Sequence, residues 1–354
     1  MKFEVPRNVL VCPLGWGLGH ASRDIPIVEQ LVIQGCRVYI AGDKSQLNYL
    51  KQYFPSIETI DFPSPKVRFA SGNTQLLPLF WFALRLPLFI CWEHYRLKRL
   101  IRKYSIDLVI SDNRYGLWSK SVESVIITHQ LRVFPPFPFR WAMPVVEVLV
   151  KRWLKRFDNV LIPDFNDKRN LAGLLSKSNG LNSLKYIGLL SRFSNIKADG
   201  LFAFYELIVI ASGPEPQRTI FVNIAKKLAV RHKLSCLIIE GSPNSGITPR
   251  CEDGVWCVGH LPDSQFAAAV KQAKYLLMRG GYSTIMDMLV LGVSGLIVPT
   301  PGQTEQEYLA KRLSDQHLFR YVTQSGLLSI DIANLQVKKL TLEMSNESFC
   351  FFKK

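Results

Sequence analysis

Two glycine-rich turns constrain the fold of this chain more than any other feature. The first, Gly-Trp-Gly-Leu-Gly-His at residues 15–20, follows the apolar run 8–13, and the second, Arg-Gly-Gly-Tyr-Ser-Thr at residues 279–284, follows the apolar run 275–278. Each run has the length of a buried strand, and each turn opens a helical pattern. Helix N-termini with closely approaching backbone bind anions. Two such termini in separate halves favour a nucleotide held between two domains.

The rest of the chain alternates between strand-like and helical runs. Strands are predicted at Val9–Cys12, Arg37–Ala41, Leu108–Ser111, Ser124–Thr128 and Asn159–Pro163, and again at Leu207–Ser212, Leu234–Glu240, Val255–Gly259, Tyr275–Met278 and Leu296–Pro299. Helices are predicted near Arg23–Gln34, Thr219–Arg231, Ser264–Ala273, Thr284–Leu291 and Glu305–Ser314. This alternation predicts an α/β fold of two Rossmann-like parallel-sheet domains that face each other across a cleft. Ligands of such sheets lie beyond the carboxyl ends of the strands.

The domain boundary is predicted from length and composition. A single core rarely grows past about 250 residues, and the chain has 354. Residues 186–200 have the polar, glycine-containing character of a linker. We therefore predict an N-terminal domain over residues 1–188, a linker over 189–200 and a C-terminal domain over 201–354. Residues 335–354 are less regular and are predicted to form a closing helix or a loose tail.

The net charge and the cysteines limit which partners, cellular setting and metal sites are expected. The net charge of +16 favours an anionic partner, but no nucleic-acid recognition motif is present, so no nucleic acid is expected. Three of the seven cysteines lie inside strand-like runs as small hydrophobic residues, and the first residues lack the succession of a signal peptide. Both features predict a reducing, cytoplasmic setting. Cys251 and Cys257 have no second pair beside them, so no metal is expected.

Two stretches combine aromatic, aliphatic and basic residues. Residues 76–92 are strongly apolar, but Pro78, Arg85 and Pro87 make them a poor and short membrane span, and they continue into the basic segment 93–104. Residues 132–157 repeat this composition, with aromatic residues followed by lysines and arginines. The pattern predicts a peripheral patch that contacts an anionic membrane surface, here the inner face of the cytoplasmic membrane. The alternative is a buried helix pair with a solvated basic face.

The first turn delivers a histidine. His20 occupies the third glycine position of a dinucleotide-binding fingerprint, and no Gly-Lys-Ser or Gly-Lys-Thr follows, so neither that fingerprint nor a P-loop fits. A histidine with a pKa near 6.5 can take a proton from a sugar hydroxyl, and Asp112, which ends the run 107–111, reaches the same sheet edge and can orient it. We predict His20 and Asp112 as the catalytic pair. Alternatively, His20 only binds phosphate and Asp112 caps the following turn.

The second turn offers donors to a diphosphate. Gly280 and Gly281 expose backbone N–H groups, and Ser283 and Thr284 add hydroxyls. Asp287 lies one helical turn beyond Ser283 on the same face, which suits a ribose diol beside the phosphate. Alternatively, Asp287 is an exposed helix carboxylate.

Two more loops follow predicted strands at the cleft. Thr304 and Glu307 match a capping box, which leaves Gln306 free to bind a sugar hydroxyl. In the loop 212–218 we predict contacts of phosphate or sugar with Ser212, Gly213 and Arg218.

Together these residues resemble the GT-B glycosyltransferases of family 28, the group of the N-acetylglucosaminyltransferase that acts on an undecaprenyl-linked peptidoglycan precursor. The resemblance covers the turn with His20, the 212–213 loop, residues 258–261 and the block 279–306. The segment 107–116 resembles a larger set of UDP-sugar transferases that pair a histidine with an aspartate. Asp287 replaces a glutamate of the peptidoglycan enzymes and Glu307 replaces a glutamine, and the first half matches them weakly. The acceptor is therefore expected to differ.

The resemblance implies a C-terminal domain that holds a UDP-sugar and an N-terminal domain that binds the acceptor. The diphosphate would lie near Gly281 and Ser283, the ribose on Asp287 and the donor sugar near Gln306 and Glu307. Further substrate contacts are implied for Gly17, Gly19, His260, Leu261, Arg279 and Gln303. No cofactor or metal would be needed, because the helix dipole and loop donors stabilise the departing diphosphate.

The expected function is an inverting, metal-independent transfer of a sugar, with N-acetylglucosamine among the candidates, from a UDP-sugar to a lipid-linked or envelope glycan acceptor at the membrane. One alternative is a UDP-sugar hydrolase or epimerase of the same fold. Another is a non-catalytic UDP-binding subunit that recruits a partner to the membrane.

Overall fold

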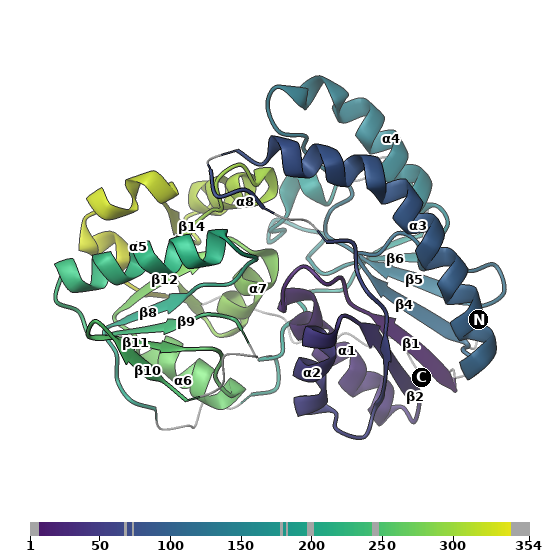
Figure 1. The fold of residues 1–354 in the computed structure, drawn as a ribbon, viewed down its shortest axis with the longest axis horizontal. Coiled ribbons are helices and arrows are strands. Elements are labelled where there is room, and N and C mark those ends of the chain that lie inside the picture. Colours follow the sequence, from purple (N-terminus) through teal and green to yellow (C-terminus); the bar gives the residue numbers. More distant parts are fainter. Residues whose placement is uncertain are drawn as a thin grey trace.

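The computed structural model describes residues 7–66, 69–72, 74–177, 180–181, 183–196, 202–242 and 248–340. These residues form two lobes, each built on a seven-stranded sheet with helices on both faces (Figure 1). The predicted α/β architecture with two parallel-sheet domains is confirmed, and the ten predicted strands are present within one or two residues of their predicted bounds.

The sheet of the N-terminal lobe is parallel throughout, with the order β3-β2-β1-β4-β5-β6-β7. Its strands are β1 (Asn8–Cys12), β2 (Arg37–Gly42), β3 (Glu58–Asp61), β4 (Leu108–Asp112), β5 (Glu123–Ile127), β6 (Asn159–Ile162) and β7 (Leu184–Tyr186). Its helices are α1 (Gly19–Ile33), α2 (Lys44–Tyr53), α3 (Leu76–Tyr104) and α4 (Met143–Leu154), with the 3-10 turns η1 (Phe139–Ala142) and η2 (Gly173–Leu175).

Alternating side chains of the central strand divide this core into two layers. Val9 and Val11 of β1 face α1 and α2, whereas Leu10 and Cys12 face the second half of α3. Strands buried on both faces read as continuous apolar runs, which is why β1 and β4 are visible in the sequence. Short strands such as β3 and β7 lack such runs and were not predicted.

The sheet of the C-terminal lobe has the order β10-β11-β9-β8-β12-β14-β15 and is parallel except for the β10–β11 hairpin. Its strands are β8 (Leu207–Ile210), β9 (Cys236–Ile239), β10 (Arg250–Glu252), β11 (Val255–Val258), β12 (Tyr275–Arg279), β14 (Leu296–Val298) and β15 (Arg320–Tyr321). Its helices are α5 (Gln217–Arg231), α6 (Asp263–Gln272), α7 (Tyr282–Val290) and α8 (Thr304–Asp315). Smaller elements are β13 (Val293–Ser294), β16 (Lys338–Lys339), η4 (Gln324–Ser329) and η5 (Ile332–Leu335).

Each sheet reverses its strand order at one point. In the first lobe β1 pairs with β2 on one side and β4 on the other, and in the second lobe β8 pairs with β9 and β12. Ligands of open parallel sheets bind beyond the strand ends at such a switch point. His20 and Asp112 follow β1 and β4, while Ser212 and Gly280 follow β8 and β12. The topology therefore brings the predicted site residues of each lobe to its switch point.

The predicted linker 189–200 lies between β7 and β8. Its described part, 189–196, is packed, with Leu190 in the core of the first lobe and Phe193 in the core of the second. Residues 197–200 lie outside the described residues, as do residues 341–354 of the predicted closing helix or tail. The described part of that last segment forms the end of η5 and the edge strand β16.

The apolar stretch 76–92, which we expected to be too short to span a membrane, is the first part of the continuous helix α3. It has 29 residues, and by length and composition alone it is apolar enough to cross a membrane, although its second half packs on the lobe through Ile90, Glu93, Leu97 and Ile101. The first half and the segment around α4 expose large apolar side chains. We call this surface the apolar cap: Leu77, Phe80, Trp81, Leu84, Leu88, Phe137, Phe139, Trp141, Val145, Val148 and Leu149. The alternative of a buried helix pair is therefore wrong.

Candidate active site

The first glycine turn holds a strained path between β1 and α1. Gly17 has a φ of +85°, which side chains rarely adopt, and a Cβ at Gly15 would lie 1.6 Å from an Asp43 oxygen. Hydrogen bonds fix the turn from outside, because Gly15 N–H donates to Ser64 Oγ at 2.8 Å and Gln46 Nε2 donates to the Leu14 carbonyl at 2.6 Å. The turn therefore presents the first residues of α1 in one defined position.

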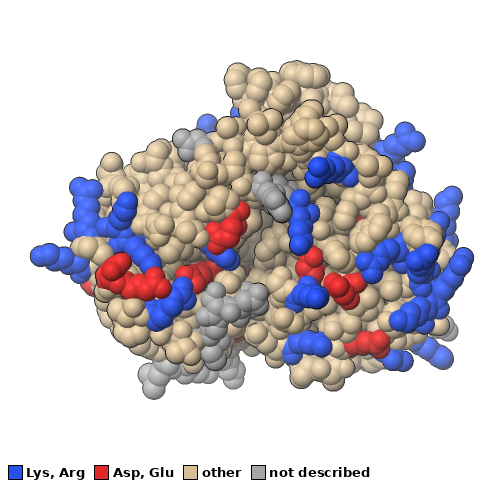
Figure 2. All heavy atoms as spheres, in the orientation of Figure 1, with Lys and Arg blue, Asp and Glu red and all other residues tan. Residues whose placement is uncertain are grey.

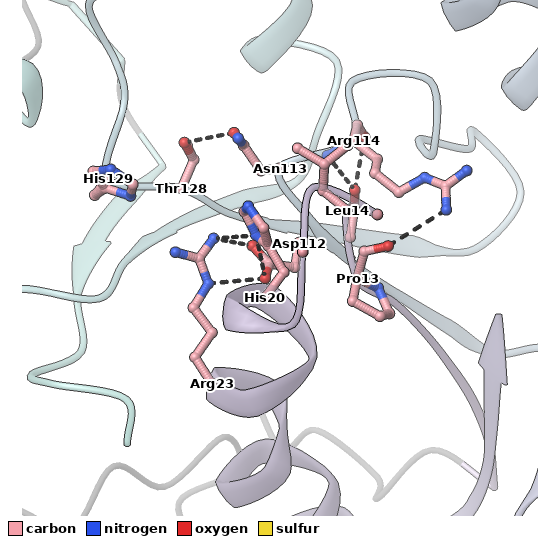
Figure 3. A network of polar contacts seen from close by, with 12 residues as sticks. Pro13, Leu14, His20, Arg23, Asp112, Asn113, Arg114, Thr128 and His129 are labelled. Atoms are coloured by element: carbon pink, nitrogen blue, oxygen red, sulfur yellow. Dashed lines mark hydrogen bonds and ion pairs between the residues drawn. The ribbon is translucent and has the colours of Figure 1, made fainter. Parts of the chain in front are cut away.

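His20 and Asp112 meet at the switch point of the first sheet (Figure 3). His20 Nδ1 lies 2.8 Å from Asp112 Oδ2, so the predicted pairing of these side chains is present in the structure. Arg23, one turn after His20, also holds Asp112: its Nε donates to Oδ2 at 2.8 Å, and its Nη2 donates to Oδ1. Asp112 is fully buried and His20 is 15% exposed. His20 Nδ1 also lies 3.0 Å from Arg23 Nη2, so the predicted role of His20 as a base falls to its other ring nitrogen, Nε2.

The electrostatics of this cluster keep the imidazole neutral. Burial lowers the pKa of His20, and Arg23 adds to that effect, whereas Asp112 opposes it. Burial alone would raise the pKa of Asp112, but the charge of Arg23 and the hydrogen bonds from Arg23 and His20 outweigh it and hold that pKa at about 2. A neutral imidazole beside an ionised carboxylate is the state that a general base requires.

A second buried carboxyl lies behind the pair. Asp24 is fully buried, and neither of its oxygens has a hydrogen-bond partner within the described residues. Burial and then the neighbouring Asp112 charge raise the pKa of Asp24 well above its usual value. Burial thus disfavours a second negative charge next to Asp112.

The second glycine turn faces the first. Gly281 precedes α7, and its neighbours Ser283 and Thr284 lie in the first turn of that helix. A Cβ at Gly19 would lie 3.1 Å from Ser283 Oγ, so the N-termini of α1 and α7 touch across the two lobes. The predicted diphosphate donors of one lobe therefore lie beside the predicted base of the other.

Asp287 is not the exposed helix carboxylate of the alternative interpretation. It is 9% exposed, and its Oδ1 accepts a 2.6 Å hydrogen bond from Ser191 Oγ of the interlobe connection. Burial raises the pKa of Asp287 to about 6, although Arg192 lowers it. Its predicted role toward ribose stays a prediction.

The loop before α8 differs from the predicted capping box. Gln303 is the N-cap residue, Thr304 Oγ1 donates to the Phe134 carbonyl of the other lobe at 2.7 Å, and Glu307 Oε1 accepts from Gly302 N–H at 2.9 Å. Gln306 Oε1 accepts from Thr300 N–H at 2.9 Å, and the predicted contact of Gln306 with a sugar hydroxyl stays a prediction. The capping box fails because Thr304 is used for contact between the lobes.

The remaining predicted contacts divide into open and enclosed positions. Ser212 lies beside α7, with its Oγ 3.4 Å from Thr284 Oγ1, and nothing crowds Gly213. Arg218 pairs with Glu215, and His260 is half-buried near Arg192. Leu261 belongs to the core. Arg279 is 1% exposed, so its guanidinium does not offer the direct substrate contact that we expected.

Three residues that the sequence analysis missed complete the face between the lobes. His129 Nε2 lies 2.7 Å from Glu305 Oε1 across the lobes, and the His129 ring stacks on Tyr282 with centroids 3.9 Å apart. Tyr282 in turn donates to the Pro163 carbonyl at 3.0 Å. His129 follows β5 at the same sheet edge as Asp112, and this position was the available signal. Its partner Glu305 belongs to the other lobe and could not be inferred from spacing.

Neither a metal cluster nor the open depression on the first lobe belongs to the part of the site that the structure describes. Within the described residues no group of three or more histidine, cysteine, aspartate or glutamate side chains has the geometry to hold a metal ion. An open depression lined by Lys120, Glu123 and Arg156 lies at the N-terminal ends of β5 and β6, at the opposite edge of the sheet from His20. This depression does not belong to the site.

Comparison with known proteins agrees with this architecture. Residues 263–354 match the Glycosyltransferase family 28 C-terminal domain. A search of curated proteins gave no match. Among solved structures, the glycotransferase of kitacinnamycin has 16% identity and a TM-score of 0.61, with 93% of this chain and 89% of that chain covered.

Two other solved structures are similar over nearly the whole chain. Arabidopsis thaliana UGT89C1 complexed with UDP-L-rhamnose has 16% identity and a TM-score of 0.60, with 94% of this chain and 89% of that chain covered. Acinetobacter baumannii MurG has 14% identity and a TM-score of 0.53, with 93% and 89% covered. At these identities the likeness shows a shared fold of two facing lobes.

Proposed function

We propose that this chain, a GT-B glycosyltransferase with a family 28 C-terminal domain, transfers a sugar from a UDP-sugar to a hydroxyl of a lipid-linked or envelope glycan at a membrane surface. The sequence-based assignment to family 28 GT-B enzymes is confirmed by these comparisons. Our proposal concerns four further points: the donor nucleotide, the acceptor, the stereochemistry of transfer and the contact with a membrane.

One observation carries the proposal. The His20–Asp112 pair lies at the switch point of one lobe, and Gly19, the residue before His20, closely approaches Ser283 at the N-terminus of α7, at the switch point of the other lobe. A base and an anion-binding helix terminus that face each other are the two parts that glycosyl transfer from a nucleotide donor requires.

The reaction follows from these positions. His20 Nε2 accepts the proton of the acceptor hydroxyl while its oxygen attacks the anomeric carbon from the face opposite the diphosphate. The bond between that carbon and the β-phosphate oxygen breaks, and its electron pair leaves with UDP. Asp112 stabilises the imidazolium that forms. The backbone N–H groups at the start of α7, with Ser283 and Thr284, stabilise the departing charge without a metal. One displacement of this kind inverts the anomeric configuration.

The choice of UDP rests on relatives. Arabidopsis thaliana UGT89C1 was crystallised with UDP-L-rhamnose, and a further neighbour with a TM-score of 0.55 was crystallised with UDP. We assign the ribose diol to Asp287, one turn into α7, whose Oδ1 accepts a hydrogen bond from Ser191. These points favour a uridine nucleotide and leave the sugar open.

The apolar cap supports a lipid-linked acceptor. Phe137 is 78% exposed and Trp141 is 75% exposed, and burying such rings at a lipid headgroup boundary is favourable. In Figure 2 the cap is almost free of charge, while lysines and arginines gather along the neighbouring side of the same lobe. The cap is also close to the base, because Phe82 of α3 contacts Trp16 of the first glycine turn with centroids 5.1 Å apart. A lipid-anchored acceptor would thus reach His20 without leaving the membrane.

The experiment is a donor and acceptor panel. We expect UDP to stabilise the protein thermally and other nucleoside diphosphates to do so less, and we expect a UDP-sugar to be consumed only with a lipid-linked acceptor, also in the presence of EDTA. Release of free sugar and UDP without acceptor would favour the hydrolase. UDP binding without turnover on a broad acceptor panel would favour the non-catalytic subunit. No stabilisation by UDP would refute the donor assignment.

Vesicle binding tests the membrane contact separately. Phe137→Ser/Trp141→Ser should reduce sedimentation with vesicles that contain anionic lipid, whereas Trp256→Ser, an exposed ring on the other lobe, should not. Equal sedimentation of the cap variant and the wild type would remove the membrane from the proposal.

A further inference from the structure

A buried ion pair beside the site has no part in the proposed reaction. Arg114, in the loop after β4, donates from Nε to Glu93 Oε1 of α3 at 2.8 Å, and the two side chains are 0% and 2% exposed. Removing a full charge from water is costly, so a buried pair persists only where its geometry supplies many hydrogen bonds. The contacts of the guanidinium indicate what this pair does.

The Arg114 guanidinium ties together the loops that follow three strands. Its Nη1 donates to the carbonyls of Pro13 at 3.4 Å and Phe62 at 3.1 Å, and its Nη2 donates to the Pro63 carbonyl at 2.9 Å. Pro13 follows β1 and the other two residues follow β3, while Arg114 itself follows β4. Figure 3 shows the guanidinium reaching Pro13 on the side of the sheet edge away from Arg23.

These loops carry the catalytic pair. The turn that begins at Pro13 ends at His20, and Asp112 lies two residues before Arg114. The Arg114 backbone is fixed to the end of β4, because Ser111 Oγ donates to the Arg114 carbonyl at 2.7 Å and accepts from its N–H at 3.2 Å. Arg114 is therefore connected to both sides of the His20–Asp112 contact.

Glu93 connects the same point to α3. Its Oε2 accepts from Gly116 N–H at 3.1 Å, and a Cβ at Gly116 would lie 2.5 Å from the Glu93 Cβ. The loop after Asp112 is thus pressed against the helix that carries the apolar cap, and Gly116 is required there by the close approach.

We propose that Arg114, with Glu93 as its counterion, is a positioning residue that sets the His20–Asp112 contact and fastens it to helix α3. The inference rests on the proposed function, because it concerns the same base. A lysine at this position keeps the charge but loses the planar fork that reaches four acceptors at once. A glutamine at position 93 keeps an acceptor but leaves the guanidinium without a counterion.

Kinetics of Arg114→Lys and Glu93→Gln test the proposal. We expect kcat to fall by about 10- to 100-fold, as for a small misplacement of reacting groups, with UDP affinity within about twofold of wild type. We also expect the acidic limb of the kcat profile to move to lower pH, because Asp112 raises the pKa of His20 and a looser contact weakens that effect. Arg37→Lys, which alters an exposed pair with Glu58 in the same lobe, is the matched control and should behave as wild type.

The outcomes separate this inference from the proposed function. A fall in kcat that matches the loss of folded protein in near-UV circular dichroism, with an unmoved acidic limb, would show a merely structural role and overturn the inference. Should a single variant fail to fold, Glu93→Leu/Arg114→Met removes both charges together and is expected to fold and to shift the limb. Unchanged turnover in His20→Ala would overturn the proposed function itself, whereas loss of turnover there with normal Arg114→Lys would overturn only this inference.

Discussion

Arg114 in the N-terminal lobe and Arg279 in the C-terminal lobe are both 1% exposed, and they differ in how their charge is balanced. Arg114 has the carboxylate of Glu93. Arg279 donates to the carbonyls of Val298, Pro299 and Gln217 and to the Gln324 side chain, and all four acceptors are neutral. Burial lowers the pKa of Arg279 to about 9, so it is still charged at neutral pH.

The two arginines lie near the carboxyl ends of the strands in their lobes, and these two sheet edges differ in how charge is balanced. The first lobe surrounds its edge with charges that have counterions, and burial lowers the pKa of His20 there. The second lobe leaves positive charge beside a helix N-terminus, an arrangement that is favourable once an anion binds. In the proposed reaction, the first edge would take part in proton transfer and the second would hold the diphosphate. Substitutions on the first edge should alter turnover, and those on the second should alter nucleotide affinity.

The largest expected effect tests the first edge. His20→Ala removes the base, so kcat should fall by about 10²- to 10⁴-fold, the usual contribution of general base catalysis. UDP affinity, measured by calorimetry, should stay near the wild-type value. If turnover and UDP affinity fell together, the two edges would not have separate roles.

Asp112→Asn should give the next largest effect. The amide keeps the shape but cannot stabilise an imidazolium, and about 100-fold in kcat is expected from a misaligned base. Asp112 raises the pKa of His20, so the acidic limb of the rate profile should move to lower pH in the variant. A limb that stayed in place would mean that His20 is not the titrating group.

The second edge is tested by Asp287→Ala. A hydrogen bond to a charged group contributes about 1.5–3 kcal/mol, so UDP affinity should weaken by at least about tenfold with little change in kcat. The pKa of Asp287 is about 6, and its stronger acceptor form is present above that pH. Wild-type affinity should therefore fall as the pH drops below 6, and the affinity of the variant should not follow. A parallel pH dependence in both proteins would exclude Asp287 from the ribose.

The smallest effect concerns stability and is confined to the first edge. The pKa of Asp24 is raised in the folded state, so the unfolded chain releases this proton first and the stability of the wild type falls as the pH rises above about 4. Asp24→Asn removes this penalty. Its melting temperature relative to the wild type should therefore increase from pH 4 to pH 7, with kcat little changed. A constant difference across this range would mean that Asp24 titrates normally.

The sequence predicts those features of the structure that neighbouring residues in the chain determine. The runs that became β1, β4, β8 and β12 are apolar enough to be recognised as buried strands, and the topology then carried His20 and Asp112 to one edge. The position of Arg23 beside His20 could also have been predicted, because Arg23 lies one turn after His20 on the same helix face. The GT-B fold could be predicted because its two turns need backbone conformations that favour glycine, and glycines are visible in the sequence.

Contacts between distant segments could not be predicted in the same way. An acidic residue such as Glu305 is common in the first turn of a helix. The local sequence therefore gave no sign that Glu305 contacts His129. The expected capping box failed for the same reason, since Thr304 bonds to Phe134 in the other lobe. Arg279 was assigned to substrate from its neighbours in the chain, but its direction is set by carbonyls of β14 and α5. Each of these errors arises where the two lobes or two loops meet.

The contact between Gly19 and Ser283 has a consequence for the catalytic cycle. The N-termini of α1 and α7 are in contact, so a diphosphate bound between them, as the proposed reaction implies, would need the two lobes to separate before it enters and before it leaves. The stacked rings of His129 and Tyr282 would have to separate each time. Opening of the lobes would then be a step of every turnover. Raising the viscosity of the solvent with glycerol should therefore slow product release in the steady state more than a single round of bond formation.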